Sequence, residues 1–209
     1  MRRPTANSLR TVVGSALLLS AVAGMGLLSG CASTPPNPNP QRDAPLLIAP
    51  VDLPRYMGRW YVIANIPYFA ERDFVGSYAE WSLRPDGRID DSFYGHKASF
   101  ESKLSHYQFL DTPDPEQGNG KWKVRLFWPI SVTQLTLYVS PDYRYTLLGY
   151  PNKRLGWIFS RDPDMNDATY QALLERLNAM GYDTSLFQRV AQHPAQLGLP
   201  GFQHPENTH

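Results

Sequence analysis

The chain has 209 residues, of which 20 are basic and 19 acidic, and three of the basic residues lie within the first ten positions. The 17 basic residues that remain form no run and are fewer than the 19 acidic residues, which argues against a nucleic-acid partner. The single cysteine excludes an intramolecular disulfide, and the five histidines show no metal-ligand spacing. We therefore expect no metal and no cofactor.

Residues 1–30 have the features of a secretory signal. Three arginines precede an uncharged run that ends at Ser29, and small residues follow at the expected cleavage point. An uncleaved membrane anchor is the alternative, because the run approaches the length of a membrane span. Leu28-Ser-Gly-Cys31 resembles the bacterial lipobox, in which the cysteine is acylated and becomes the first residue of the mature protein. The resemblance implies lipid attachment at Cys31.

Residues 31–50 are rich in proline and polar residues and have no hydrophobic periodicity. We expect an acylated N-terminus followed by an extended tether. Ala32 follows the cysteine, and in similar lipoproteins this implies sorting to the outer membrane, with the domain facing the periplasm of a Gram-negative cell. Residues 51–190 have the length of one domain, and residues 191–209 read as a disordered tail.

The domain has a period of two along most of its length. In the stretch from Lys121 to Trp128, apolar and basic residues alternate cleanly. Eight such runs, separated by turn signals, predict an antiparallel sheet that closes as a barrel or splits into a sandwich. The predicted strands are 60–66, 78–83, 89–94, 104–110, 121–128, 135–139, 145–150 and 155–161.

The period changes after the eighth strand. Apolar residues fall at helical spacing over residues 166–180, with Asn166 as the N-cap and Gly181 as the C-terminal stop. We expect one helix that packs an apolar stripe on the outside of the sheet. Residues 185–190 could add a final short strand.

Three short motifs in these elements point to a protein family. Gly58-x-Trp60 opens the first strand, Asp142-Tyr143 lies in a turn about 80 residues later, and Arg161 ends the eighth strand. In order and spacing they resemble the signature motifs of the lipocalins, and the likeness is greatest to the bacterial outer-membrane lipocalins and apolipoprotein D. The resemblance covers nearly all of residues 51–190 and implies an eight-stranded up-and-down β-barrel, the lipocalin calyx, with a C-terminal helix outside.

The resemblance also implies roles for these signature residues. Trp60 would close the bottom of the barrel, Arg161 would lie across its ring, and Gly58 would permit a close backbone approach, so all three are structural. Two positions depart from the family pattern. Val62 stands where relatives often have glutamate, which makes the lower cavity more apolar, and Pro141 precedes the aspartate where threonine is usual.

A barrel of eight strands can hold one small ligand. From the strand alternation and the loop after the first strand, we expect a cavity that takes a fatty acid or a (lyso)phospholipid, a class the resemblance implies. The alternative for each residue is an ordinary core position or a solvated loop. The expected ligand-binding residues are Val62, Ala64, Phe69, Val124, Leu126, Leu137 and Val139.

Catalytic chemistry has little support in the sequence, and we assign no catalytic residue. No Gly-x-Ser-x-Gly elbow and no glycine-rich phosphate loop occur. Asp90 and Asp91 are adjacent on a strand, point to opposite faces, and read as a solvated pair before a turn.

Three functions follow from these observations. The favoured one is a membrane-anchored carrier that stores or moves single-chain lipids or phospholipids by non-covalent binding. The second is an enzyme on the same scaffold, acting on a lipophilic substrate. The third is a structural lipoprotein with a filled core, which binds a protein partner or a second copy of the chain through Trp128, Pro129 and Ile130.

Overall fold

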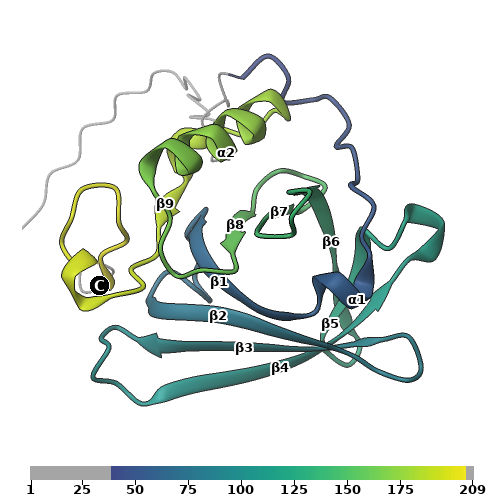
Figure 1. The fold of residues 1–209 in the computed structure, drawn as a ribbon, viewed down its shortest axis with the longest axis horizontal. Helices are drawn as coiled ribbons and strands as arrows, with labels where there is room; N and C mark the ends of the chain where they lie inside the picture. Colours follow the sequence, from purple (N-terminus) through teal and green to yellow (C-terminus); the bar gives the residue numbers. More distant parts are fainter. Residues whose placement is uncertain (1–38, 206–209) are drawn as a thin grey trace, which may run out of the picture. The chain divides into compact units, whose positions relative to one another are not determined.

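The structure is a computed structural model that describes residues 39–205 (Figure 1). Cys31 and residues 1–38 as a whole, together with residues 206–209, lie outside the described part. Within it the barrel strands are β1 (Gly58–Asn65), β2 (Phe74–Leu83), β3 (Ile89–Lys97), β4 (Leu104–Pro113), β5 (Lys121–Phe127), β6 (Ile130–Val139), β7 (Tyr145–Gly149) and β8 (Gly156–Ser160). The other elements are α1 (Leu53–Tyr56), η1 (Pro115–Gln117), α2 (Asp167–Ala179), η2 (Thr184–Leu186), β9 (Gln188–Arg189) and η3 (Pro194–Gln196).

The eight long strands form a closed antiparallel barrel. Each strand from β2 to β7 pairs with the next along the chain, β8 pairs with β1, and β1 pairs back onto β2. The pair Trp60 and Ala79 belongs to this closing ladder. The barrel and its eight predicted strands are confirmed, and the sandwich is excluded. No helix among residues 39–205 is both long enough and apolar enough to cross a membrane.

Helix α2 packs on the outside of the barrel, as predicted. The Asn166 side chain accepts a hydrogen bond from the Thr169 amide at 2.8 Å, and Gly181 follows the helix with φ +92°. The buried stripe of Tyr170, Leu173 and Leu177 faces a cluster that includes residues of β1, β6, β7 and β8 (Figure 1). This second apolar cluster, outside the barrel, is separate from the one within it.

Bulges in two strands decide which side chains belong to which cluster. The pairing of β1 with β8 shifts between Val62 and Ala64, and that of β6 with β7 shifts between Thr136 and Tyr138. One extra residue at a bulge reverses the facing of all residues beyond it. Strict alternation therefore fails along both strands.

Residues 39–50, which the sequence predicts to be part of an extended tether, are bound to the barrel. From residue 39 this segment runs along the barrel toward α1 (Figure 1). The Lys153 ammonium donates to the carbonyl oxygens of Gln41, Arg42 and Ala44 at 3.1, 2.7 and 2.6 Å, and the Ala49 amide donates to Thr136 O at 2.9 Å. We call residues 39–50 the strap. The Lys153 side chain and the Thr136 carbonyl of β6 hold this proline-rich segment in place.

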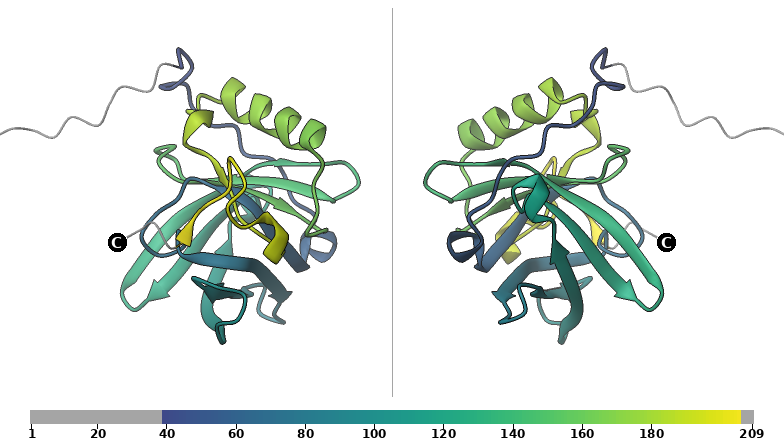
Figure 2. Two further views of the ribbon diagram at one scale, coloured as in Figure 1. Left: turned by 90° about the vertical axis from the view of Figure 1, so that its left-hand side faces the viewer. Right: turned by 90° about the vertical axis from the view of Figure 1, so that its right-hand side faces the viewer.

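The residues after Ala191 are also ordered as far as 205, so the prediction of a disordered tail from residue 191 is wrong for this part. The Gln192 amide donates to the Val62 and Ser77 carbonyls at 2.8 and 3.1 Å, and Gln203 donates to Asn65 Oδ1 at 2.6 Å. Figure 2 shows this segment folded back beside the barrel. Buried amide side chains fix it, a signal that composition does not reveal.

Candidate binding cavity

The closed end of the barrel is an aromatic floor. Trp60, Trp81, Trp122 and Tyr56 are almost completely buried. The Tyr56 and Trp81 rings stack with centroids 5.1 Å apart, and Trp81 meets Trp122 edge-on at 5.2 Å. The Trp60 indole N–H donates to Tyr56 O at 2.8 Å. This dense packing seals one end of the barrel, as the resemblance implies for Trp60.

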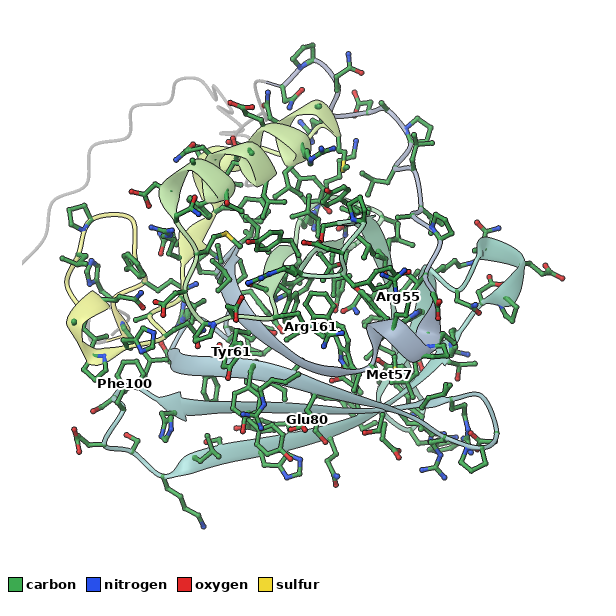
Figure 3. All side chains as sticks on the ribbon, in the orientation of Figure 1. Arg55, Met57, Tyr61, Glu80, Phe100 and Arg161 are labelled. Atoms are coloured by element: carbon green, nitrogen blue, oxygen red, sulfur yellow. The ribbon has the colours of Figure 1, made fainter. Side chains whose placement is uncertain are left out.

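Arg161 fastens the short helix α1 to this floor. Its guanidinium carbon lies 3.8 Å from the centre of the Trp60 ring. Its Nη2 donates to the carbonyl oxygens of Arg55, Tyr56 and Met57 at 3.0, 3.1 and 2.8 Å, which have no partner within α1 because they lie at its end (Figure 3). The cation–π contact is as expected, whereas α1 and its capping by arginine are absent from the sequence-based prediction.

Gly58 and the turn between β6 and β7 complete the closed end. Gly58 has φ +94°, and a Cβ there would lie 3.4 Å from Arg161 Nη1. The Asp142 carboxylate accepts from Ser140 Oγ at 2.6 Å and from the Arg144 amide at 3.2 Å. The Tyr143 hydroxyl accepts from the Asp52 amide at 3.0 Å. These residues hold the fold together and do not touch the cavity, and the turn forms with Pro141 in it.

A cavity of about 360 Å³ occupies the other end of the barrel. The loop between β1 and β2 borders it, together with the ends of β3, β5 and β7. Its lining is strongly aromatic. The aromatic lining residues are Tyr68, Phe69, Phe74, Trp81, Phe93, Tyr107, Phe109, Tyr150, Trp157 and Phe159. The barrel is therefore partly empty rather than filled by its core.

The structure brings only some of the predicted ligand-binding residues to this cavity. Phe69, Val124 and Leu126 line it. Val62 is buried in the cluster inside the barrel, and Val139 packs against that cluster, but neither reaches the cavity.

Two predicted positions lie on the other side of the sheet. Ala64 and Leu137 belong to the cluster beneath α2. The bulges in β1 and β6 are the reason, because the prediction assumed unbroken alternation. Their placement in the cavity was wrong.

The loop between β1 and β2 brings an acidic side chain, Glu71, to the cavity. The prediction took only Phe69 from this loop as a ligand-binding residue, whereas in the structure the Glu71 side chain also lines the cavity. The Trp157 indole and the Asn65 amide donate to Oε2 at 2.8 and 2.9 Å, and the Tyr68 hydroxyl donates to Oε1 at 2.9 Å. Burial raises the pKa of Glu71, and these three hydrogen bonds oppose the rise.

Two further carboxyl groups lie inside the barrel. Asp91 lines the cavity, and Asp111, which is fully buried, lies diagonally across the β3–β4 ladder from it. Burial, and for Asp111 also the neighbouring Asp91, raises the pKa of Asp91 to about 7 and that of Asp111 to about 9. Asp91 Oδ1 and both carboxyl oxygens of Asp111 have no hydrogen-bond partner among the described residues.

The solvated pair expected at Asp90 and Asp91 is thus wrong for one member. The two side chains do point to opposite faces: Asp90 pairs with Arg84 at 2.9 Å on the outer face, whereas Asp91 points inward. The predicted strand ends at residue 110, but β4 continues through Pro113 because Asp111 and the residues after it pair with β5. Tyr107, Phe109 and Asp111 are spaced two residues apart, and this alternation could have indicated that Asp111 also points into the barrel.

A family model described as a lipocalin-like domain matches residues 51–192. The chain is a lipocalin. Temperature-induced lipocalin-1 of Arabidopsis thaliana is 33% identical over 153 residues, covering 68% of this chain and 80% of that protein. Outer membrane lipoprotein Blc of Escherichia coli K12 is 28% identical over 178 residues, covering 84% and 96%. The bacterial relationship expected from the motifs is confirmed.

Solved structures show the same fold at lower identity. Lobster apocrustacyanin A1 superposes with a TM-score of 0.55 at 17% identity, covering 69% of this lipocalin and 81% of that chain. Insecticyanin of the tobacco hornworm Manduca sexta gives a TM-score of 0.54 at 18% identity, covering 72% and 85%. The family and the open cavity together identify a binding site for a small hydrophobic ligand.

Proposed function

We propose that this lipocalin is a membrane-anchored carrier that binds one single-chain lipid, a fatty acid or a lysophospholipid, and stores or moves it at the outer membrane by non-covalent binding. The observation that carries the proposal is the aromatic cavity of about 360 Å³ in an otherwise closed barrel. Ligand sites of this kind span roughly 300–1,000 Å³, so the volume favours one acyl chain over the two of an ordinary phospholipid.

The energetics support such a ligand. Each methylene removed from water contributes roughly 0.8 kcal/mol, so eight buried methylenes contribute about 6 kcal/mol before the cost of ordering the chain. No covalent step is needed. Among residues 39–205, no group of three or more His, Cys, Asp or Glu side chains has the arrangement of a metal site.

Attachment to the membrane is supported by the lipobox resemblance at Cys31 and by the relative named outer membrane lipoprotein Blc. An acylated Cys31 would lie eight residues before Asn39, the first residue of the strap. At no more than about 3.6 Å per residue, those residues span at most about 29 Å. The proposed anchor therefore keeps the barrel close to the lipid from which its ligand would come.

A cavity-filling variant tests the carrier function. Leu126→Trp puts a larger ring into the cavity, and Arg125→Trp puts the same ring on the outer face of β5 as the matched control. With lysophospholipid, fatty acid and a two-chain phospholipid as probes, native mass spectrometry should show one single-chain lipid per protein, lost in Leu126→Trp and kept in Arg125→Trp. Equal binding by both variants, or none by the wild type, would contradict a cavity carrier.

A further inference from the structure

The cavity of this lipocalin is acidic as well as aromatic. Its lining includes three carboxyl groups, Glu71, Asp73 and Asp91, and one basic residue, Lys97. Lys97 is an exposed residue at the end of β3. Asp73 lies 3.9 Å from the guanidinium of Arg72, which also faces solvent. The two remaining carboxyl groups lie deeper, where the walls are apolar.

Glu71 is arranged as a preorganised acceptor with no countercharge. Its three donors are an indole, an amide and a hydroxyl, all of them neutral. No Lys or Arg of the described residues lies in contact with its carboxylate. A carboxylate offers about four lone-pair positions, so three donors leave about one for a ligand. The three donors favour the ionised carboxylate and so oppose the burial that raises its pKa, and a cation beside Glu71 favours the ionised form further.

Aromatic rings surround the same carboxylate. Tyr68 and Trp157 donate to it, and their rings meet edge-on with centroids 6.1 Å apart. Tyr150 packs against Trp157 with centroids 5.4 Å apart. All three rings line the cavity. Faces of Tyr and Trp attract cations, and a cage of such rings is how quaternary ammonium groups are recognised elsewhere.

An anionic head group would be repelled in this cavity. A fatty-acid carboxylate placed in the cavity would face the charge of Glu71 and the negative faces of the rings, at low dielectric where repulsion is strong. Asp91 also lines the cavity, and among the described residues no basic side chain is paired with it. These features favour a cationic head group over an anionic one in the cavity.

We infer that this cavity selects a single-chain amphipath whose head group is an ammonium, with Glu71 and the ring cage of Tyr68, Tyr150 and Trp157 as its recognition site. The inference rests on the proposed carrier function and narrows its ligand class. An ammonium group can come from a simple alkylamine or from a zwitterionic lysolipid. In the latter, the phosphate would have to be accommodated away from Glu71, and Lys97 at the rim is the basic residue available for it.

The test compares probes that share one dodecyl chain. The full chain is placed in phospholipid nanodiscs, with empty nanodiscs as the partition blank, and each probe displaces the neutral dye N-phenyl-naphthylamine at neutral pH. The probes are dodecyltrimethylammonium, dodecanol, dodecanoate and lysophosphatidylcholine with a dodecanoyl chain. We expect the ammonium probe to bind at least about tenfold more tightly than dodecanoate, with dodecanol between them.

The variants locate the preference. Glu71→Gln should weaken the ammonium probe about tenfold and change dodecanol less than threefold. Glu116→Gln, an exposed glutamate near the closed end, should change neither. If Glu71→Gln does not fold, the wild-type ranking of probes still decides the question. A lysolipid that binds like the ammonium probe identifies the zwitterionic source, and one that binds no better than dodecanol identifies the simple amine.

Two results would overturn the inference and differ in what they say of the carrier. Saturable binding of dodecanol with dodecanoate equal to or tighter than the ammonium probe rejects the charge selection and leaves the carrier intact. Failure of every probe to displace the dye rejects both.

Discussion

Arg161 lies over the ring of Trp60 at 3.8 Å and at the same time caps the last carbonyl groups of α1. One side chain thereby joins the end of β8, the start of β1 and the helix that closes the barrel. Both residues lie at the end of the barrel opposite the cavity, and neither lines it. Stability and ligand binding are therefore separable at this position.

Replacing Arg161 with Ala should lower the free energy of unfolding by about 3 kcal/mol, because the cation–π contact is lost and the carbonyls of Arg55 and Met57 lose their donor. Arg161→Lys keeps the charge without the planar fork and should lose about half as much. Arg144→Ala removes an exposed arginine paired with Asp162 and should cost less than 1 kcal/mol. Urea unfolding measures all three, and a large loss of ligand affinity at unchanged stability would contradict the structural role.

The Asp91 and Asp111 pair should make stability depend on pH. The folded-state pKa values, about 7 and about 9, lie above the unfolded value near 4, so the folded protein binds the extra protons. Their contribution is complete below about pH 4 and is lost as pH rises toward 9. Asp111→Asn should flatten this decline and raise stability at pH 9 by on the order of 1–3 kcal/mol.

Asp90→Asn is the matched control for this titration, because Asp90 is the adjacent carboxylate on the outer face. Urea unfolding at several pH values from 4 to 9 measures the slope. A wild-type slope that survives in Asp111→Asn would show that the pair does not titrate in this range.

The strap should contribute to stability. A chain beginning at Val51 loses the three carbonyl acceptors of Lys153, the Ala49 hydrogen bond and the packing of Leu46 and Ile48 against the outer cluster. It should be about 3 kcal/mol less stable than a chain beginning at Asn37. Equal midpoints in thermal unfolding would show that the strap is not held in solution.

A substitution at Gly120 tests the contact between the strap and the barrel without removing residues from the chain. A Cβ at Gly120 would overlap the Ala49 carbonyl, whereas one at Gly87 would meet nothing. Gly120→Ala should cost about 2 kcal/mol through steric displacement of the strap. Gly87→Ala costs only its left-handed backbone, at most about 2 kcal/mol, and should leave the proteolytic resistance of the strap unchanged. Limited proteolysis at residues 39–50 distinguishes the two.

Acylation at Cys31 is tested in the producing bacterium. With radiolabelled palmitate, the wild type should be labelled and should fractionate with the membrane, and Cys31→Ser should lose both properties. Persistent labelling of the Ser variant would reject the lipobox.

Local patterns in the sequence were enough to predict the strands, the helix and the family. Alternation along residues 121–128 and helical spacing from Asn166 predict elements whose faces are set by periods of two and 3.6. The Gly58, Trp60 and Arg161 motifs then specify the family. These features need no knowledge of distant neighbours, because each depends on residues a few positions apart.

Which side chains line the cavity depends on contacts between distant parts of the chain. Ala64 and Leu137 lie outside the barrel because one extra residue at a bulge reverses the facing of a strand, and nothing in the apolar run marks where that residue is. Glu71 turns inward because Asn65 and Trp157, from two different strands, supply its donors. Asp111 is buried because β4 pairs with β5 through residues that resemble a turn. Register and loop closure are long-range properties, and they convert a predicted apolar pocket into an acidic one.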